Sequence, residues 1–182
     1  MRYVLKIVLA LTITCGACAF SLAFVSRVTK DKIEQNARKR IEDAIMRLAP
    51  ETKKIEEVKA AGGIYQLYDA KNSLVSLAFL AEGDGYQGKI KMLGVIAPSL
   101  ERMQGVEIID SVETPGLGAR IAEDFFKDQF KTLRVAPAIE CVKDKVSADN
   151  QISAITGATI SSRAVANIMN KRVAELKTRF GK

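Results

Sequence analysis

Histidine and tryptophan are missing from this chain of 182 residues, and cysteine occurs only three times. Without histidine the chain lacks the commonest metal ligand and the usual general base, which excludes histidine-based metal centres and catalytic triads. Cys15 and Cys18 fall in an apolar N-terminal segment and Cys141 stands alone outside it, so the globular part has no disulfide framework. The sequence also has no nicotinamide-binding motif and no cysteine cluster for an iron–sulfur centre.

Acidic and basic residues are interleaved along the chain. Lysine and arginine number 28 against 21 acidic residues, which gives a net charge of +7 at pH 7. Arg38-Lys39-Arg40, for example, is closely followed by Glu42-Asp43. Because a nucleic-acid interface needs a clustered basic face, this distribution argues against a nucleic-acid partner.

The longest apolar run lies at the N-terminus. From Val4 to Val25 every residue except Lys6 is apolar or small. At the rise of an α-helix such a run spans roughly 33 Å, about the thickness of one hydrocarbon core. Residues 1–26 are therefore predicted to form a transmembrane anchor.

Two alternatives to an uncleaved anchor remain open. Ala17-Cys18-Ala19 has the small-x-small form of a signal-peptide cleavage site, although the apolar run is longer than the usual signal core of roughly 7–15 residues. Gly16-Ala17-Cys18 has the form of a lipoprotein site, but Cys15 occupies the place where such signals usually carry leucine. Basic residues flank both ends of the run, so charge alone does not give its orientation.

Apolar periodicity divides the rest of the chain. Helical spacing predicts a linking helix over 27–50 that ends at Pro50. From 54 to 97, short runs rich in Val, Ile, Leu and Tyr are separated by turn residues, which favours strands and hairpins. A further strand is predicted at 106–109, followed by a helical stripe of apolar residues between Ala119 and Phe130 that we expect in the core: Ile121, Phe125, Phe126 and Phe130.

A long helical pattern closes the chain, with apolar residues from Ala164 to Phe180 at helical spacing. Together these elements predict one α+β domain over 51–182, with an antiparallel sheet and flanking helices.

The final helix is preceded by a cluster of small and hydroxyl residues, Ser153-Ala154-Ile155-Thr156-Gly157-Ala158-Thr159-Ile160-Ser161-Ser162. A helix start offers unpaired backbone N–H groups and a partial positive charge, so the cluster is a candidate phosphate anchor. Serine and threonine are also ordinary N-cap residues, and a simple capped helix explains the same spacing. Spacing alone leaves both interpretations open.

The stretch Thr156-Gly157-Ala158-Thr159-Ile160-Ser161-Ser162 resembles the flavinylation motif of FMN-binding domains. Two other stretches, Gly85-Tyr86-Gln87-Gly88-Lys89-Ile90 and Glu113-Thr114-Pro115-Gly116-Leu117-Gly118, match the same family in the right order. With the apolar N-terminal segment, the chain resembles the G subunit of the Rnf electron-transport complex and, more distantly, the C subunit of the sodium-pumping NADH:quinone reductase. One position departs from the family pattern, because Ser153 stands where an acidic residue is common.

The resemblance implies that a flavin transferase esterifies Thr159 to the phosphate of FMN, and that the loop at 113–118 lies against the isoalloxazine ring. Tyr86 and Gly88 are expected to be mainly structural. The residues that the resemblance places at the cofactor are Thr159, Thr156, Gly157, Ala158, Ser161, Ser162, Glu113, Thr114, Gly116, Leu117 and Gly118.

The resemblance also implies a role for the whole protein: a membrane-anchored, covalently flavinylated electron-transfer subunit of an ion-translocating ferredoxin:NAD oxidoreductase. Its partners would be the other integral-membrane subunits, and its domain would lie on the extracytoplasmic, periplasmic side of the inner membrane. Such a protein is not a complete enzyme, since its electron donor and acceptor lie in partner subunits. An FMN-binding electron carrier outside an ion pump and a non-redox anchored binding or assembly domain are the alternatives.

Overall fold

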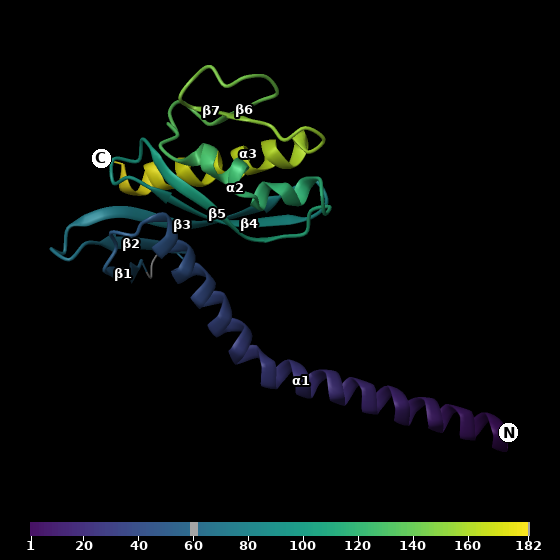
Figure 1. The fold of residues 1–182 in the computed structure, drawn as a ribbon. Helices are drawn as coiled ribbons and strands as arrows, with labels where there is room; N and C mark the ends of the chain where they lie inside the picture. The colour runs from purple at the N-terminus through teal and green to yellow at the C-terminus, as the bar shows by residue number, and fades with distance from the viewer. Residues whose placement is uncertain (59–61, 182) are drawn as a thin grey trace. The chain divides into compact units, whose positions relative to one another are not determined.

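The computed structural model describes residues 1–58 and 62–181, and it divides the chain into two units, Met1–Arg40 and Ile41–Lys182 (Figure 1). The first unit is almost entirely helical and is part of helix α1, which spans Arg2–Leu48. One 18-residue window of this helix has a mean hydropathy of 2.2, and none of it is buried. The helix is thus long and apolar enough to cross a membrane, which supports a membrane location. The anchor and the linking helix that the sequence predicts are both parts of this one continuous helix.

The second unit is built on a five-stranded antiparallel sheet in which strand order follows chain order. Its strands are β1 (Lys54–Glu57), β2 (Ile64–Tyr68), β3 (Leu74–Asp84), β4 (Lys89–Ile96) and β5 (Met103–Ser111). Antiparallel neighbours need only short connections, and the Gly- and Asp-containing turns at 69–73 and 85–88 supply them. The antiparallel sheet predicted from the sequence is confirmed.

Both faces of the sheet are covered, so β3 and β4 are buried on two sides. Leu77 and Phe79 face one layer, while Ala78 between them faces the other, as alternation along a strand requires. The last turns of α1 cover the second layer, where Ala44 and Ile45 are fully buried. Because these turns complete a core, they belong to the compact unit and not to the apolar helix before it.

Helix α3 (Thr159–Phe180) covers the first layer and lies along the sheet (Figure 1). Val165, Met169 and Leu176 are at most 1% exposed, so the predicted apolar face of this helix is confirmed. A β-carbon at Gly94 of β4 would lie 2.9 Å from the Met169 side chain. Glycine there lets the helix approach the sheet closely.

The segment between β5 and β6 forms short helical pieces instead of the single helix suggested by its periodicity. They are η1 (Gly118–Ala122), α2 (Asp124–Lys127) and η2 (Asp128–Phe130). Phe126 and Phe130 are fully buried, but the prediction that Phe125 belongs to the core is wrong, since it is 49% exposed. The helix is interrupted after Ala122, so residues beyond this break do not keep the helical face that continuous spacing would give them. Phe125 instead lies beside the Arg120 guanidinium.

Strands β6 (Glu140–Val142) and β7 (Gln151–Ser153) form a separate two-stranded parallel sheet that the sequence pattern does not predict. Each strand has three residues, too few for alternation to be recognised.

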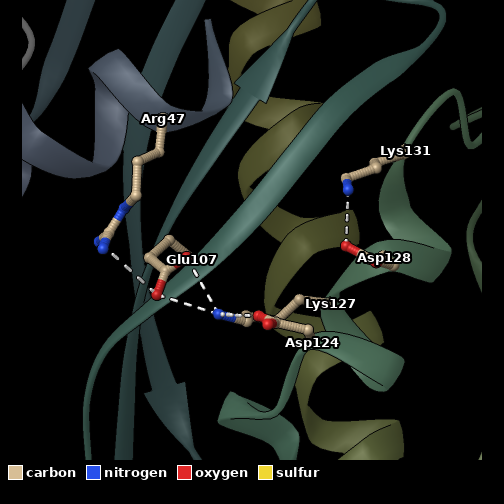
Figure 2. Close-up of polar contacts among 6 residues, drawn as sticks. All are labelled: Arg47, Glu107, Asp124, Lys127, Asp128 and Lys131. Atoms are coloured by element: carbon tan, nitrogen blue, oxygen red, sulfur yellow. Dashed lines mark hydrogen bonds and ion pairs between the residues drawn. The ribbon is translucent and has the colours of Figure 1, made fainter.

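Charged residues join α1, β5 and α2 (Figure 2). Glu107 on β5 lies 3.2 Å from Lys127 and 3.9 Å from Arg47 of α1, and Lys127 also reaches Asp124 at 3.1 Å. Burial lowers the pKa of Lys127, but its hydrogen bonds to Asp124 and Glu107 outweigh that effect and hold the pKa above its ordinary value. The Lys127 side chain is 13% exposed, so this contact is better shielded from water than a surface ion pair.

Candidate functional site

A cavity of about 420 Å³ lies at the N-terminus of α3, a size within the range of small-molecule sites. Three segments that are far apart in the sequence surround it: the 85–88 turn, the 113–118 loop and the 157–161 helix start. Its lining residues are Tyr86, Glu113, Thr114, Leu117, Gly118, Gly157, Ala158, Thr159, Ile160 and Ser161. The fold thus brings together the three stretches on which the family resemblance rests.

Eight of the eleven site residues expected from the sequence line this cavity, and Thr156, Gly116 and Ser162 do not. Tyr86 and Ile160 line it as well, with 68% and 58% of their surface exposed. The sequence motifs indicated a mainly structural role for Tyr86 and did not single out Ile160. Both lie inside the quoted motifs, and their large apolar side chains among small and polar residues were the signal that could have identified them.

Helix α3 begins without a side-chain cap. Its N-cap residue is Ala158, and no side chain bonds to the first turn. In the part of the chain that the structure describes, the N–H groups of Thr159, Ile160 and Ser161 have no hydrogen-bond partner. Gly157 precedes the helix with a φ of +82°, a conformation that favours glycine. The simple capped-helix interpretation of the hydroxyl cluster is therefore wrong, because none of these hydroxyls acts as the cap.

The four hydroxyl groups between Thr156 and Ser162 differ in what they do. Ser162 is fully buried, where its Oγ accepts a hydrogen bond from the Ile155 N–H at 3.0 Å and donates one to the Ala158 carbonyl. Ser161 is 2% exposed and donates to Glu113 Oε2 at 2.6 Å. Thr156 is exposed and lies outside the cavity lining. Thr159 lines the cavity, and its hydroxyl has no partner among the described residues.

Glu113 is the charged side chain of the lining, and it is only 6% exposed. Its Oε1 accepts hydrogen bonds from the N–H groups of Tyr86 at 2.7 Å and Gln87 at 3.1 Å, while Oε2 accepts the Ser161 hydroxyl. Burial raises the pKa of this carboxyl group, but the hydrogen bonds from Ser161 and from the backbone of the 86–88 turn outweigh burial and hold the pKa below its ordinary value. Glu113 is therefore an anion at neutral pH.

The 114–118 loop forms the apolar side of the cavity. Thr114 starts the loop and its hydroxyl donates to the Gln87 side chain. Gly116 has a φ of +75° with open space around its α-carbon, and Leu117 is half exposed. A β-carbon at Gly118 would lie 2.7 Å from Ser161 Oγ, so glycine is needed there for close packing.

No lysine or arginine belongs to this lining as the described residues define it, and its one charged group is negative. A free phosphate in the cavity would have only the backbone N–H groups of the α3 start to hold it, with an anion close by. The site is thus poorly suited to retaining a phosphate by charge pairing.

Comparison with known proteins identifies the family. The sequence pattern of the FMN-binding domain matches residues 85–174, which include all three motifs. The G subunit of the proton-translocating ferredoxin:NAD(+) oxidoreductase complex of Clostridium ljungdahlii is 34% identical over 94% of this chain and 90% of its own length. The chain belongs to this G-subunit family. The G subunit of the Na(+)-translocating ferredoxin:NAD(+) oxidoreductase complex of Acetobacterium woodii is 28% identical over 94% of this chain and 91% of its own length.

Another G-subunit relative, from Methanosarcina acetivorans, is 26% identical over 94% of both chains. Among solved structures, Shewanella oneidensis NqrC matches with a TM-score of 0.59 at 20% identity, covering 72% of this chain and 68% of its own. The C subunit of the Na(+)-translocating NADH-quinone reductase of Parabacteroides distasonis matches with a TM-score of 0.57 at 19% identity, covering 65% and 62%. These structures share the fold of the FMN-binding domain.

The cavity suits an FMN group on three counts. The unpaired N–H groups at the start of α3 match a phosphoryl group. The exposed apolar surfaces of Tyr86, Leu117 and Ile160 match a flat aromatic ring. The Thr159 hydroxyl lies free at the cavity wall, where a phosphoester would need its oxygen.

Proposed function

We propose that this chain is a membrane-anchored electron-transfer subunit of an Rnf-type ion-translocating oxidoreductase, with FMN bound as a phosphoester of Thr159. The observation that supports it best is the free Thr159 hydroxyl beside unpaired N–H groups, in a cavity with no cationic residue among its described lining. A phosphate that cannot be held by charge can be held by a covalent bond.

Elimination favours Thr159 over its neighbours. The Ser161 and Ser162 hydroxyls are buried and bonded to protein groups, so neither is available to an external enzyme. Thr156 is accessible but lies outside the cavity lining, so a flavin attached there would start from the wrong position. Thr159 combines accessibility with a position at the cavity wall.

The attachment requires an activated donor, which we assign to a flavin pyrophosphate carried by the transferase. Thr159 Oγ1 forms a bond to the flavin phosphorus, the pyrophosphate P–O bond breaks, and the leaving phosphate carries away the electron pair. A base of the transferase takes the threonine proton, because the cavity's own carboxylate is already occupied by hydrogen bonds. The product carries one FMN less one water.

When bound, FMN supplies reversible one- and two-electron transfer. The chain's own residues would have three tasks: the α3 start would hold the phosphoryl group, Leu117 and Tyr86 would cover the ring, and Glu113 would fix the walls of the cavity. Because neither end of an electron path is encoded in this chain, the donor and acceptor are other subunits of the complex. The G-subunit relatives are named as parts of such complexes.

The proposal extends to the location and the division of the chain. We assign residues 1–26 to an uncleaved membrane anchor, residues 27–50 to the linking helix and residues 51–182 to the FMN domain on the periplasmic side of the inner membrane. A covalent bond is useful there, since a flavin lost outside the cytoplasm cannot be replaced from the cytoplasmic pool.

The test is to produce the full chain with and without a flavin transferase and to examine the denatured protein. Flavin fluorescence that survives denaturing electrophoresis only when the transferase is present is the expected result, and cleavage at Lys145 and Arg163 should leave it on the 146–163 peptide. Protein without flavin under both conditions would refute covalent flavinylation. If flavin is attached but no ion-pump subunits co-purify, an independent electron carrier is the better assignment.

A further inference from the structure

Every hydrogen bond that Glu113 accepts comes from the protein itself. One oxygen is bonded to the 85–88 turn and the other to the first turn of α3, so both are used before any ligand binds. The protein therefore occupies three of the roughly four lone-pair sites of this carboxylate. What it brings to the cavity is a fixed negative charge.

Two glycines make room for this carboxylate. A β-carbon at Gly85 would collide with Glu113 Oε1, and one at Gly118 would collide with Oε2. The glycines come from different segments around the carboxylate, one from the turn after β3 and the other from the loop after β5. The two glycines thus leave space for the carboxylate at this place, and its three hydrogen bonds hold it there.

No charged side chain in the described lining offsets that charge, because the other lining side chains are uncharged. Charges interact more strongly in a partly enclosed site than in water, since the effective dielectric constant is lower. Each electron added to a group in the cavity adds negative charge beside an existing anion. Reduction in this cavity is therefore disfavoured relative to reduction in water.

From these contacts we infer that Glu113 is an electrostatic positioning residue, whose fixed charge lowers the reduction potential of the flavin at this site. The inference rests on the proposed function, because it requires flavin in this cavity. It adds a residue that controls the potential, whereas the proposed function states only where the flavin is attached.

The experiment compares the midpoint potential of the flavinylated full chain with that of Glu113→Gln, which keeps the shape and removes the charge. We expect the midpoint potential to rise by about 59 mV for a one-electron couple, which is about a tenfold fall in the oxidised-to-reduced ratio at a fixed ambient potential. Glu101→Gln, which removes an exposed carboxylate elsewhere, is the control and leaves the potential unchanged. A potential in Glu113→Gln that matches this control overturns the inference.

A second variant separates charge from packing. Ser161→Ala removes one of the carboxylate's hydrogen bonds but keeps its charge, so its shift should be smaller than that in Glu113→Gln. Equal shifts in the two variants would mean that the cavity's shape sets the potential, and the inference would be wrong.

A third comparison does not depend on whether Glu113→Gln folds. Ile160 lines the cavity and is 58% exposed, so it tolerates a polar side chain. Ile160→Lys places a cation in the same cavity as the carboxylate and should raise the potential, whereas Ile160→Gln should not. Identical potentials in these two variants refute electrostatic control. Flavin is first detected on a denaturing gel in the parent chain and in each variant. Its absence from the parent chain refutes the proposed function, whereas an unmoved potential in the flavinylated variants refutes only the inference.

Discussion

Flavin attachment and fold stability should depend on different hydroxyl groups at the start of α3. Thr159→Val removes a hydroxyl with no partner among the described residues, so we expect the free energy of unfolding to change by less than about 0.5 kcal/mol. The same change should abolish covalent flavin, lowering the intact mass by one FMN less one water. Thr156→Val is the matched control and should keep both flavin and stability.

Ser162→Ala should behave in the opposite way. It leaves the buried Ile155 N–H without its acceptor, which costs about 1–3 kcal/mol. For a domain of this size that corresponds to a fall in melting temperature of about 2–12 °C. Thermal unfolding of the flavin-free full chain in detergent, followed by circular dichroism, measures this loss, and the folded fraction should still accept flavin.

Two results would refute this reasoning. Retention of covalent flavin in Thr159→Val together with its loss in Thr156→Val would show that the wrong hydroxyl has been assigned. A greater loss of stability in Thr159→Val than in Ser162→Ala would show that the free and bonded hydroxyls have been confused.

Three further predictions concern the loop, the ion pairs and the topology. Gly118→Val should destabilise the domain because its side chain collides with the Glu113–Ser161 pair. Gly116→Val has free space, so the domain should stay folded despite the strain of the positive φ, while the flavin spectrum shifts. Unfolding curves and flavin spectra of both variants measure these effects. Glu107→Gln should cost about 1–3 kcal/mol, since it leaves the largely buried Lys127 with one carboxylate, and urea unfolding of parent and variant will detect it. A reporter fused after the C-terminus should be active only outside the cytoplasm, and activity inside would contradict the periplasmic assignment.

Apolar run length, helical periodicity and the spacing of turn residues predicted the longer elements. The apolar N-terminal helix, the strands of the main sheet and α3 each have enough residues for a pattern to appear. The three-residue strands β6 and β7 do not, and the helical break after Ala122 moved Phe125 out of the stripe to which its spacing assigned it. Short elements depend on tertiary contacts that local sequence does not contain.

Motif resemblance named most of the cavity lining and assigned the attachment to Thr159. It did not predict what the neighbouring hydroxyls do. Their separation into bonded and free groups depends on Glu113, which is 48 positions from Ser161 in the sequence. Only the fold shows that the Ser161 hydroxyl is hydrogen-bonded to this carboxylate and that the Ser162 hydroxyl is hydrogen-bonded to the backbone.

The burial of Ala44 and Ile45 has a practical consequence for making a soluble version of this protein. A fragment that starts after Pro50 would expose Ala78 and Leu93 on the second face of the sheet, because the turns that cover them would be lost. Exposed apolar strands in the middle of a sheet promote aggregation. A fragment cut just before Ile41 would remove the apolar helix and keep both layers of the core.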